Sequence, residues 1–392
     1  MAPRSRKYKR QSRRDWSGGR KKAIDAMKAN RPESGRNWDK LFPTPWSFII
    51  FVAYMALFIN QGIMVTASQQ ADNTYSYNTV TVVLLTEATK LVASLIIFLK
   101  DSKLSTLIAD MRIHVYVLGL YMIPALLYCL YNNLAFVNLA AFDPTTYFLF
   151  LQLRVVVTGI IFQVLFKKQL SKRQWISLII LTIGCVVKQL SMSKKPEASS
   201  AETEATFKAV FSNLISIHTG LLLVQVFCSC LAGVYNEKLL KDTGAEVHIM
   251  VQNVFMYTDS IFCNVVVLFC RGELISAFTT TSLLQVWQPA VIVIILNNAA
   301  VGIVTSFFLR SLNSILKTFA SALELMFTAV LSWVIFGIPV DWCTAIAIAL
   351  VSYATYMYAQ SPVVNRGRLD ELEKNSTAEE EVLVKNGSPS PV

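Results

Sequence analysis

Four ionisable residues lie in the middle of long apolar segments of this chain: Glu87, Lys90, Arg154 and Lys317. Inserting one such side chain into a membrane helix costs about 2.5–3.5 kcal/mol on the translocon scale, so a position that faces lipid is unfavourable. We therefore expect each of them to face a water-filled cavity or a partner inside a helix bundle. Ionisable groups with this placement usually serve a substrate.

Residues three, four and seven positions apart share one face of a helix, and several polar residues of the apolar segments follow this spacing. They are Tyr128, Tyr131 and Asn132; Tyr147 and Arg154; Ser229, Gly233 and Asn236; Asn253 and Tyr257; and Lys317, Ser321 and Glu324. Lys and Arg neutralise phosphate oxygens, and Arg can donate two parallel hydrogen bonds. Tyr rings can stack on a base or a sugar. Together these faces predict a phosphorylated ligand that contains a ring.

The same residues allow other interpretations. Glu87 and Lys90 are three residues apart and could form a purely structural ion pair. Arg154 could instead pair across helices with Glu324 or Asp259. Each of these two acids could be a counter-ion, a proton site or a ligand for a sugar hydroxyl. Single Tyr residues are often anchors at the membrane surface, which is the alternative for the Tyr residues named above.

The elements that must position these residues are membrane helices. Hydrophobic residues make up 54% of the 392 residues and charged residues only 16%, whereas soluble domains contain roughly 25% charged residues. Segments of the length needed for one crossing lie at 46–67, 79–99, 115–138, 144–166, 175–192, 212–236, 248–270, 286–309, 312–336 and 340–360. The expected fold is all-α: a polytopic membrane protein with ten transmembrane helices.

A polar connector at 193–211 divides these segments into five and five, at 45–192 and 212–360. An odd number of crossings per half gives the two halves opposite orientations, which predicts two inverted five-helix repeats with a site between them near the membrane midplane. A basic tail at 1–44 precedes the repeats. A polar tail at 361–392 follows them, and its composition predicts disorder.

Nearly all of the formal net charge of +11 comes from residues 1–40, which contain fourteen Lys or Arg and four acidic residues. Directly before a membrane span, such a tail indicates a cytosolic anchor rather than an arm that binds nucleic acid. The basic loops near 100–112, 167–173, 310 and 366–368 then fall on the same side of the membrane. We expect both termini in the cytosol, the connector in the lumen, and no nucleic acid as a partner.

Signatures of soluble enzymes are missing from the chain. It has no glycine-rich phosphate loop, no HExxH zinc motif and no nucleophile elbow. Its seven Cys residues are scattered over the apolar segments without a nearby His that would complete a metal site. The sequence therefore predicts a protein that is not an enzyme and that uses neither a metal nor a cofactor.

Five stretches of the chain resemble the nucleotide-sugar transporter family, in the branch that carries CMP-sialic acid, UDP-galactose and UDP-N-acetylglucosamine. They are Leu85 to Lys90, Tyr128 to Phe136 with its continuation through Tyr147 to Arg154, Cys228 to Lys238, Asn253 to Tyr257, and Ser314 to Phe319. The resemblance implies a drug/metabolite transporter-like fold. It also implies an antiporter of the Golgi or endoplasmic-reticulum membrane, which brings a cytosolic nucleotide sugar into the lumen in exchange for a nucleoside monophosphate.

The resemblance further implies which residues form the substrate site. In this family the matching positions contact nucleotide, which gives Tyr128, Asn132, Tyr147, Asn253, Tyr257 and Lys317, with Ser229 and Gly233 as small residues that allow close approach. Glu87, Lys90 and Arg154 complete the candidate set of substrate-binding residues.

Departures from the family pattern bear on the choice of sugar. Arg154 stands where the sialic-acid carrier has Lys, and Cys230 and Thr318 replace family glycines, which argues against CMP-sialic acid. The run 314–336 and the ending 359–365 are similar to the senju-type UDP-galactose transporters. UDP-galactose, exchanged for UMP, is therefore the expected substrate.

Three competing functions stay open at this point. The chain could carry another nucleotide sugar, such as UDP-N-acetylglucosamine or CMP-sialic acid. It could be a membrane scaffold that has the fold without transport, or a proton-coupled carrier that uses Asp259 and Glu324 as proton sites. Membrane lipid is the other expected partner, and self-association is open.

Overall fold

The computed structural model describes residues 41–67, 77, 79–142, 144–193, 217–272, 274–336 and 341–365. All regular elements within these residues are helices, and no strand occurs among them, which confirms the predicted all-α class. The predicted basic tail (1–44), connector (193–211) and C-terminal tail (361–392) lie mostly outside the described residues.

The long helices fall at the positions that the apolar segments predicted. Their bounds are α3 (Pro45–Ala67), α4 (Thr79–Asp101), α6 (Val115–Ala141), α7 (Pro144–Leu151), α8 (Arg154–Phe166), α9 (Lys172–Ser193), α11 (Ile217–Lys238), α12 (Ile249–Arg271), α15 (Pro289–Ser311), α16 (Ser314–Phe336) and α17 (Trp342–Gln360). In the described part of the chain, eight helical stretches are long and apolar enough to cross a membrane. The chain is therefore a polytopic membrane protein. The crossings expected at 46–67 and 175–192 coincide with α3 and α9 and stay predictions.

Two features differ from the expected pattern of one straight helix per segment. The segment 144–166 forms two helices, α7 and α8, which are separated by a turn at residues 152–153. Short helices also occur between the long ones, namely α5 (Leu104–Ile113), the π-helical turn η2 (Leu239–Thr243), α13 (Leu274–Ala277) and α14 (Thr280–Val286). Because of the turn after α7, Arg154 occupies the first position of α8.

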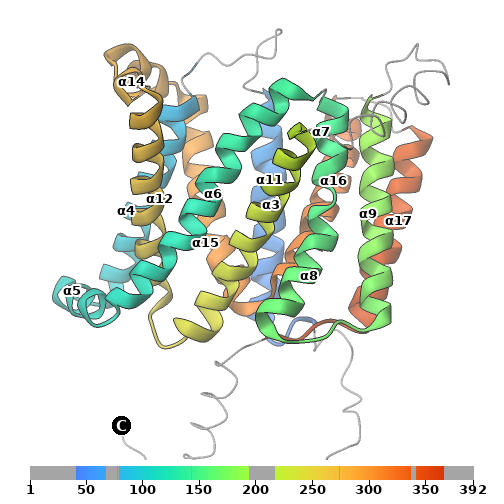
Figure 1. Cartoon of the computed structure of the whole chain (residues 1–392), viewed down its shortest axis with the longest axis horizontal. Helices are drawn as coiled ribbons and strands as arrows, with labels where there is room; N and C mark the ends of the chain where they lie inside the picture. Colours follow the sequence, from blue (N-terminus) through green and yellow to red (C-terminus); the bar gives the residue numbers. More distant parts are fainter. Residues whose placement is uncertain are drawn as a thin grey trace, which may run out of the picture.

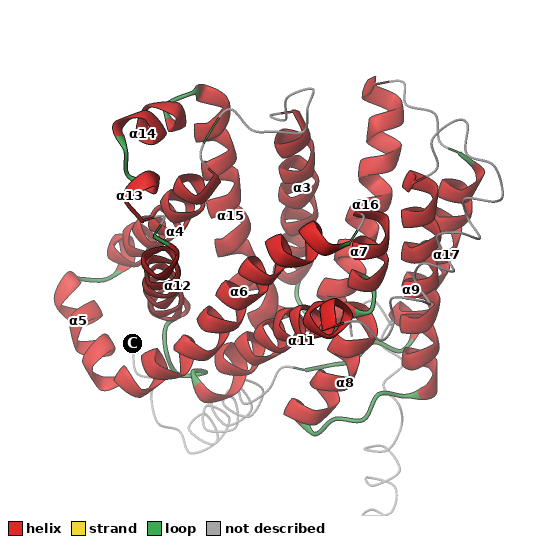
Figure 2. Cartoon of the chain, turned by 45° about the horizontal axis from the view of Figure 1, so that its top comes forward, coloured by secondary structure: helices red, strands yellow, loops and turns green. Residues whose placement is uncertain are grey.

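The long helices pack into one bundle (Figures 1 and 2). At one edge α9 packs against α17, and at the other α4 packs against α12. Between them, α3 packs against α15, and α11 packs against α6 and α8. Many large apolar side chains point outward from these helices, for example Ile96, Val164 and Phe227. Such outward apolar surface is in keeping with helices that cross a membrane.

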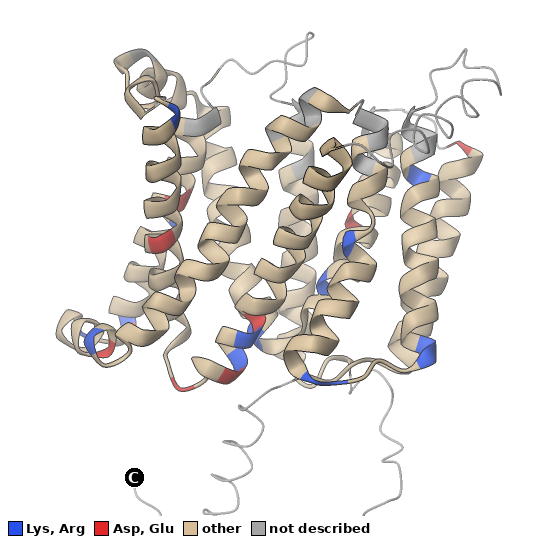
Figure 3. Ribbon diagram, viewed as in Figure 1, with Lys and Arg blue, Asp and Glu red and all other residues tan. Residues whose placement is uncertain are grey.

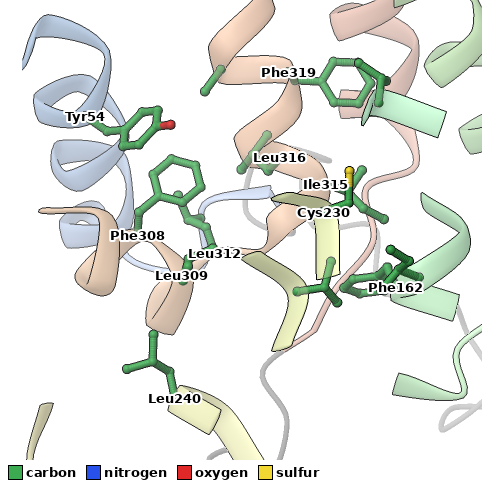
Figure 4. Packing of buried hydrophobic residues seen from close by; sticks show 14 of the residues in the cluster. Tyr54, Phe162, Cys230, Leu240, Phe308, Leu309, Leu312, Ile315, Leu316 and Phe319 are labelled. Atoms are coloured by element: carbon green, nitrogen blue, oxygen red, sulfur yellow. The ribbon is translucent and has the colours of Figure 1, made fainter. Parts of the chain in front are cut away.

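Buried apolar side chains surround the hairpin formed by α15 and α16 (Figure 4). Phe308 at the end of α15 and Phe319 in α16 are both 0% exposed. The ring of Phe308 lies 4.6 Å from the ring of Tyr54 in α3, and the ring of Phe319 stacks on Tyr358 of α17 at 4.4 Å. The hairpin is therefore held by helices of both halves of the chain.

Basic side chains gather at one end of the bundle, where Figure 3 shows most of the Lys and Arg positions. We call this the basic end; among the residues at it are Lys100, Lys103, Arg112, Lys167, Lys168, Lys172, Arg173 and Arg310. They lie in the connections after α4, α8 and α15 or in the adjoining helix ends. The loops that the sequence assigned to one side of the membrane are thus brought together.

A buried polar cluster lies at the basic end. Glu237 and Lys241 form an ion pair of 2.9 Å, and both side chains are 0% exposed. The Lys241 ammonium also donates to the backbone oxygens of Leu312 and Asn365. Glu237 accepts hydrogen bonds from the backbone N–H of Ser314 at 2.7 Å, from its hydroxyl at 2.5 Å, and from the Asn365 side chain at 2.6 Å. This cluster joins α11, the α15–α16 turn and the segment after α17.

A second group of hydrogen bonds lies beside this cluster. The hydroxyl of Tyr121 in α6 donates to Gln252 of α12 at 2.6 Å. The Gln252 amide in turn donates to the backbone oxygens of Gly244 and Val247 at 2.8 and 3.0 Å. Arg310 donates to the Val247 oxygen at 3.3 Å. Both groups satisfy their buried polar atoms internally, as a structural role requires.

The ion pair gives a stability prediction. Removing one partner of a buried pair leaves an uncompensated charge, which typically costs roughly 3–5 kcal/mol. We expect Lys241→Met to lower the thermal unfolding temperature of the purified protein in detergent markedly. We expect the double variant Glu237→Gln/Lys241→Met to recover much of that loss, because no buried charge is then left unpaired.

Lys238→Met, three residues earlier on the same helical stretch, is the matched control because Lys238 belongs to no ion pair in the described structure. If Lys241→Met and Lys238→Met unfold at the same temperature, the buried pair does not stabilise the basic end.

Candidate functional site

Three adjoining cavities run through the middle of the bundle. The first has a volume of about 390 Å³ and is bordered by α3, α4, α6, α11, α12, α15 and α16. The second is a small cavity of about 120 Å³, and the third has about 380 Å³. Tyr128 and Lys317 line both the first and the second cavity, whereas Arg154, Thr318 and Ser321 line both the second and the third. The two cations thus lie where one cavity passes into the next.

The first cavity collects most of the predicted site residues. Its lining includes Glu87, Lys90, Tyr128, Asn132, Asn253, Tyr257 and Lys317, which come from four different helices. Each occupies the polar face that helical spacing had indicated. The structure therefore brings together in one place residues that are separated by up to 230 positions in the chain.

Glu87 and Lys90 form an ion pair of 2.7 Å, and their side chains are only 14% and 16% exposed. The pair nevertheless borders the first cavity, and the Lys90 ammonium lies 5.5 Å from the centre of the Tyr257 ring. Gly302 makes room for it, because a Cβ at this position would come within 2.7 Å of the Lys90 side chain. The structure is therefore compatible with both interpretations of Glu87 and Lys90. They form an ion pair, as a structural role requires, and they also border the cavity, as a role in substrate binding requires.

Three side-chain amides of the first cavity have buried atoms without a hydrogen-bond partner in the described structure: Gln61 Oε1, Asn253 Nδ2 and Asn298 Oδ1. A buried donor or acceptor that stays unsatisfied costs about 1–3 kcal/mol. The lining of the first cavity contains six side-chain amides in all, those of Gln61, Asn132, Asn236, Asn253, Asn264 and Asn298. An amide can both donate and accept hydrogen bonds, so this lining suits a polar ligand.

Arg154 and Lys317 have no carboxylate within 4 Å among the residues that the structure describes. The alternative in which Arg154 pairs across helices with Glu324 or Asp259 is therefore not realised. The charge of Arg154 acts on Lys317 by repulsion and on Glu324 by attraction. Two cations that border the same small cavity leave a positive potential there, which suits phosphate oxygens.

The remaining predicted residues are placed as follows. Ser229 and Gly233 line the second cavity, opposite the two cations. A Cβ on Gly233 would lie in ordinary contact with the Tyr128 hydroxyl, at 3.7 Å. Tyr147 is buried outside the three cavities, and its hydroxyl accepts a hydrogen bond of 2.8 Å from Gln225 of α11. Its role as a ligand stays a prediction.

Several residues of the cavities were not singled out from the sequence. Gln61, Asn264 and Asn298 line the first cavity, and Gln152 and Gln189 line the third. The available signal was a single amide within an apolar segment, which does not by itself distinguish a ligand contact from an interhelical hydrogen bond. Asn297 illustrates the second case, since it accepts a bond of 2.9 Å from Asn60 of α3.

The chain was compared with known proteins. The family model described as "Nucleotide-sugar transporter" matches residues 47–359. The chain is 57% identical over 362 residues to the UDP-galactose transporter senju of Drosophila melanogaster, with 87% of this chain and 93% of that protein covered. It is 30% identical over 307 residues to CMP-sialic acid transporter 3 of Oryza sativa subsp. indica, with 74% and 72% covered.

A solved crystal structure shares the fold, with a TM-score of 0.54 and 14% sequence identity over 82% of this chain and 98% of that one. At this identity the likeness concerns the fold alone. The family match covers nearly all of the described helices, including every one that borders the three cavities. The chain belongs to the nucleotide-sugar transporter family.

Proposed function

We propose that this chain is an antiporter of the Golgi membrane that imports UDP-galactose into the lumen in exchange for UMP. The choice of sugar is supported by the 57% identity to a protein named as a UDP-galactose transporter. The Golgi location and the exchange for UMP are in keeping with the resemblance of the sequence motifs to this family.

The observation that carries the proposal is the pair of cations without ion-pair partners, Arg154 and Lys317, in the second cavity, which adjoins the amide-lined first cavity. In this arrangement the nucleoside occupies the first cavity, where Asn253 and Asn298 meet the base and the Tyr rings stack on it. The phosphates lie in the second cavity, within reach of both cations. UDP-sugar and UMP both carry a phosphate, so both can use this site.

The pattern of helix packing supports two inverted repeats, 45–192 and 212–360. If α3, α4, α6, α7–α8 and α9 correspond in order to α11, α12, α15, α16 and α17, the contacts exchange in pairs. Thus α3 packs on α15 as α11 packs on α6, and α4 packs on α15 as α12 packs on α6. α4 packs on α12 and α9 packs on α17, and in each of these pairs the two helices are equivalent under the same correspondence. A two-fold axis in the membrane plane would produce this pattern.

The orientation follows from the basic end. Lys and Arg accumulate in cytosolic loops of membrane proteins, so the basic end faces the cytosol, and both termini lie there too. The buried cluster of Glu237 and Lys241 then closes the cytosolic side in this conformation. Rocking one repeat against the other would open it and close the luminal side.

The charges of Arg154 and Lys317 favour exchange of substrates over net transport in one direction. An empty site leaves Arg154 and Lys317 without compensation, and desolvating such cations during a change of orientation is costly. A bound phosphate removes that cost, so the loaded carrier switches sides more easily. UMP that binds from the lumen allows the carrier to turn back toward the cytosol.

We expect proteoliposomes that contain the purified protein to take up radiolabelled UDP-galactose rapidly when they are preloaded with UMP. Uptake into empty or CMP-loaded vesicles should be at least several-fold slower, because the carrier then returns empty or with a poorer ligand. Equal initial rates in all three preparations contradict obligatory exchange with UMP. Competition by unlabelled UDP-N-acetylglucosamine and CMP-sialic acid in the same assay ranks the alternative cargoes.

A second prediction concerns the phosphate contact. A hydrogen bond to a charged group contributes roughly 1.5–3 kcal/mol, and about 1.4 kcal/mol corresponds to a factor of ten. We therefore expect Lys317→Ala to lower the exchange of both UDP-galactose and UMP by at least about tenfold. The rate of labelled-substrate uptake in UMP-loaded proteoliposomes measures it.

Lys188→Met is the control for Lys317→Ala. Lys188 is also a buried lysine of a long helix, but it donates to Thr344 at 2.9 Å and borders none of the three cavities. Exchange by the control should stay within about twofold of the unaltered protein. An equal loss in both variants would assign the effect of Lys317 to folding instead of to phosphate.

A further inference from the structure

The third cavity has a different chemical character from the first. It lies beyond Arg154 as seen from the first cavity and is about as large, at about 380 Å³. Its polar lining consists of Tyr131, Gln152, Arg154, Gln189, Thr318, Ser321 and Glu324, and no lysine borders it. The first cavity, by contrast, is bordered by two lysines, Lys90 and Lys317, and one acid, Glu87, that is already paired with one of them.

Glu324 is the group of the third cavity that needs a partner of a definite kind. It is half-buried and forms no ion pair in the described structure. An ionised carboxylate is only an acceptor, so it repels phosphate and attracts O–H donors. Its two oxygens can accept from two neighbouring hydroxyls at once, as they do from the two N–H groups of Arg. The amides of Gln152 and Gln189 can both donate and accept.

The position of Glu324 relative to the phosphate site fits a ligand that continues from it. Lys317 and Glu324 lie seven residues apart on the same face of α16, which is about 10 Å along the helix axis. Arg154 borders the space between them, from the first turn of α8. A ligand with its phosphates at Lys317 and Arg154 would place the group attached to its terminal phosphate beside Glu324.

From these observations we infer that the third cavity is the sugar subsite and that Glu324 is a specificity-determining residue that accepts hydrogen bonds from hexose hydroxyls. The inference rests on the proposed function, because it assigns the nucleotide to the first cavity and the phosphates to the second. UMP has no sugar beyond its phosphate, so it would not reach Glu324.

The main competing role for Glu324 is that of a counter-ion for Arg154. Its charge does act on Arg154, but the two side chains are not within ion-pair distance. A counter-ion would affect every ligand that uses Arg154, whereas a sugar contact affects only ligands with a sugar. The two roles therefore differ in which substrate is impaired.

The test compares two exchange reactions in UMP-loaded proteoliposomes: uptake of labelled UDP-galactose and uptake of labelled UMP. Glu324→Gln keeps the shape of the side chain and removes its charge. We expect the ratio of UDP-galactose uptake to UMP uptake to fall at least about tenfold, the effect of losing one charge-assisted hydrogen bond. The loss should appear mainly as a higher KM for UDP-galactose.

Asp259→Asn is the matched control. Asp259 is also a buried acid of a long helix, and its Oδ2 atom has no hydrogen-bond partner in the described structure, but it borders none of the three cavities. Its ratio of the two uptake rates should equal that of the unaltered protein. Glu324→Asp, which keeps the charge on a shorter side chain, should restore part of the ratio that Glu324→Gln loses.

Three results overturn the inference. An unchanged ratio in Glu324→Gln means that the carboxylate does not contact the sugar. An equal loss of both reactions, in protein that Glu324→Asp shows to be folded and active, means that Glu324 serves Arg154. If the unaltered protein exchanges UMP but no UDP-sugar, the subsite is wrong although a nucleotide site exists, whereas no exchange of UMP at all overturns the proposed function itself.

Discussion

The constraint on which the arrangement depends is the presence of two cations, Arg154 and Lys317, deep in apolar helices without an acid to neutralise them. A charge in this position is tolerated only beside polar groups or a wet cavity. The three cavities provide such polar surroundings for the two cations. Hydroxyl and amide side chains line these cavities, and a fully apolar bundle would lack them. The open space at the centre is thus a consequence of the same residues that attract phosphate.

The polar groups at the basic end differ from those of the cavities in what surrounds them. At the basic end, Glu237 and Lys241 have all their strong interactions with other parts of the chain. Arg154 and Lys317 line the second cavity and have no ion-pair partner in the described structure. Polar atoms without a partner also occur away from the cavities, for example in Asn138 and Thr328, so a missing hydrogen bond alone does not mark the site. The site is marked by cations and amides that line connected open space.

Helix positions could be predicted because runs of about twenty apolar residues are a local property of the chain. The same holds for the site faces, since Tyr128 with Asn132 and Asn253 with Tyr257 are neighbours on their own helices. Relations between helices could not be predicted in this way. Whether Tyr147 meets a ligand or Gln225, and whether Glu324 meets Arg154 at ion-pair distance, depends on how helices far apart in sequence turn toward each other.

The buried cluster at the basic end and the proposed phosphate site share one piece of structure, the first turn of α16. The backbone N–H and hydroxyl of Ser314 bind Glu237, and Lys317 follows three residues later on the same turn. On the other side, Asn236 of α11 borders the first cavity, and its neighbour Glu237 holds the closure. A helix turn moves as a unit, so a displacement of this turn changes both places together. In the proposed antiporter, this short element would couple occupancy of the site to movement at the basic end, as exchange requires.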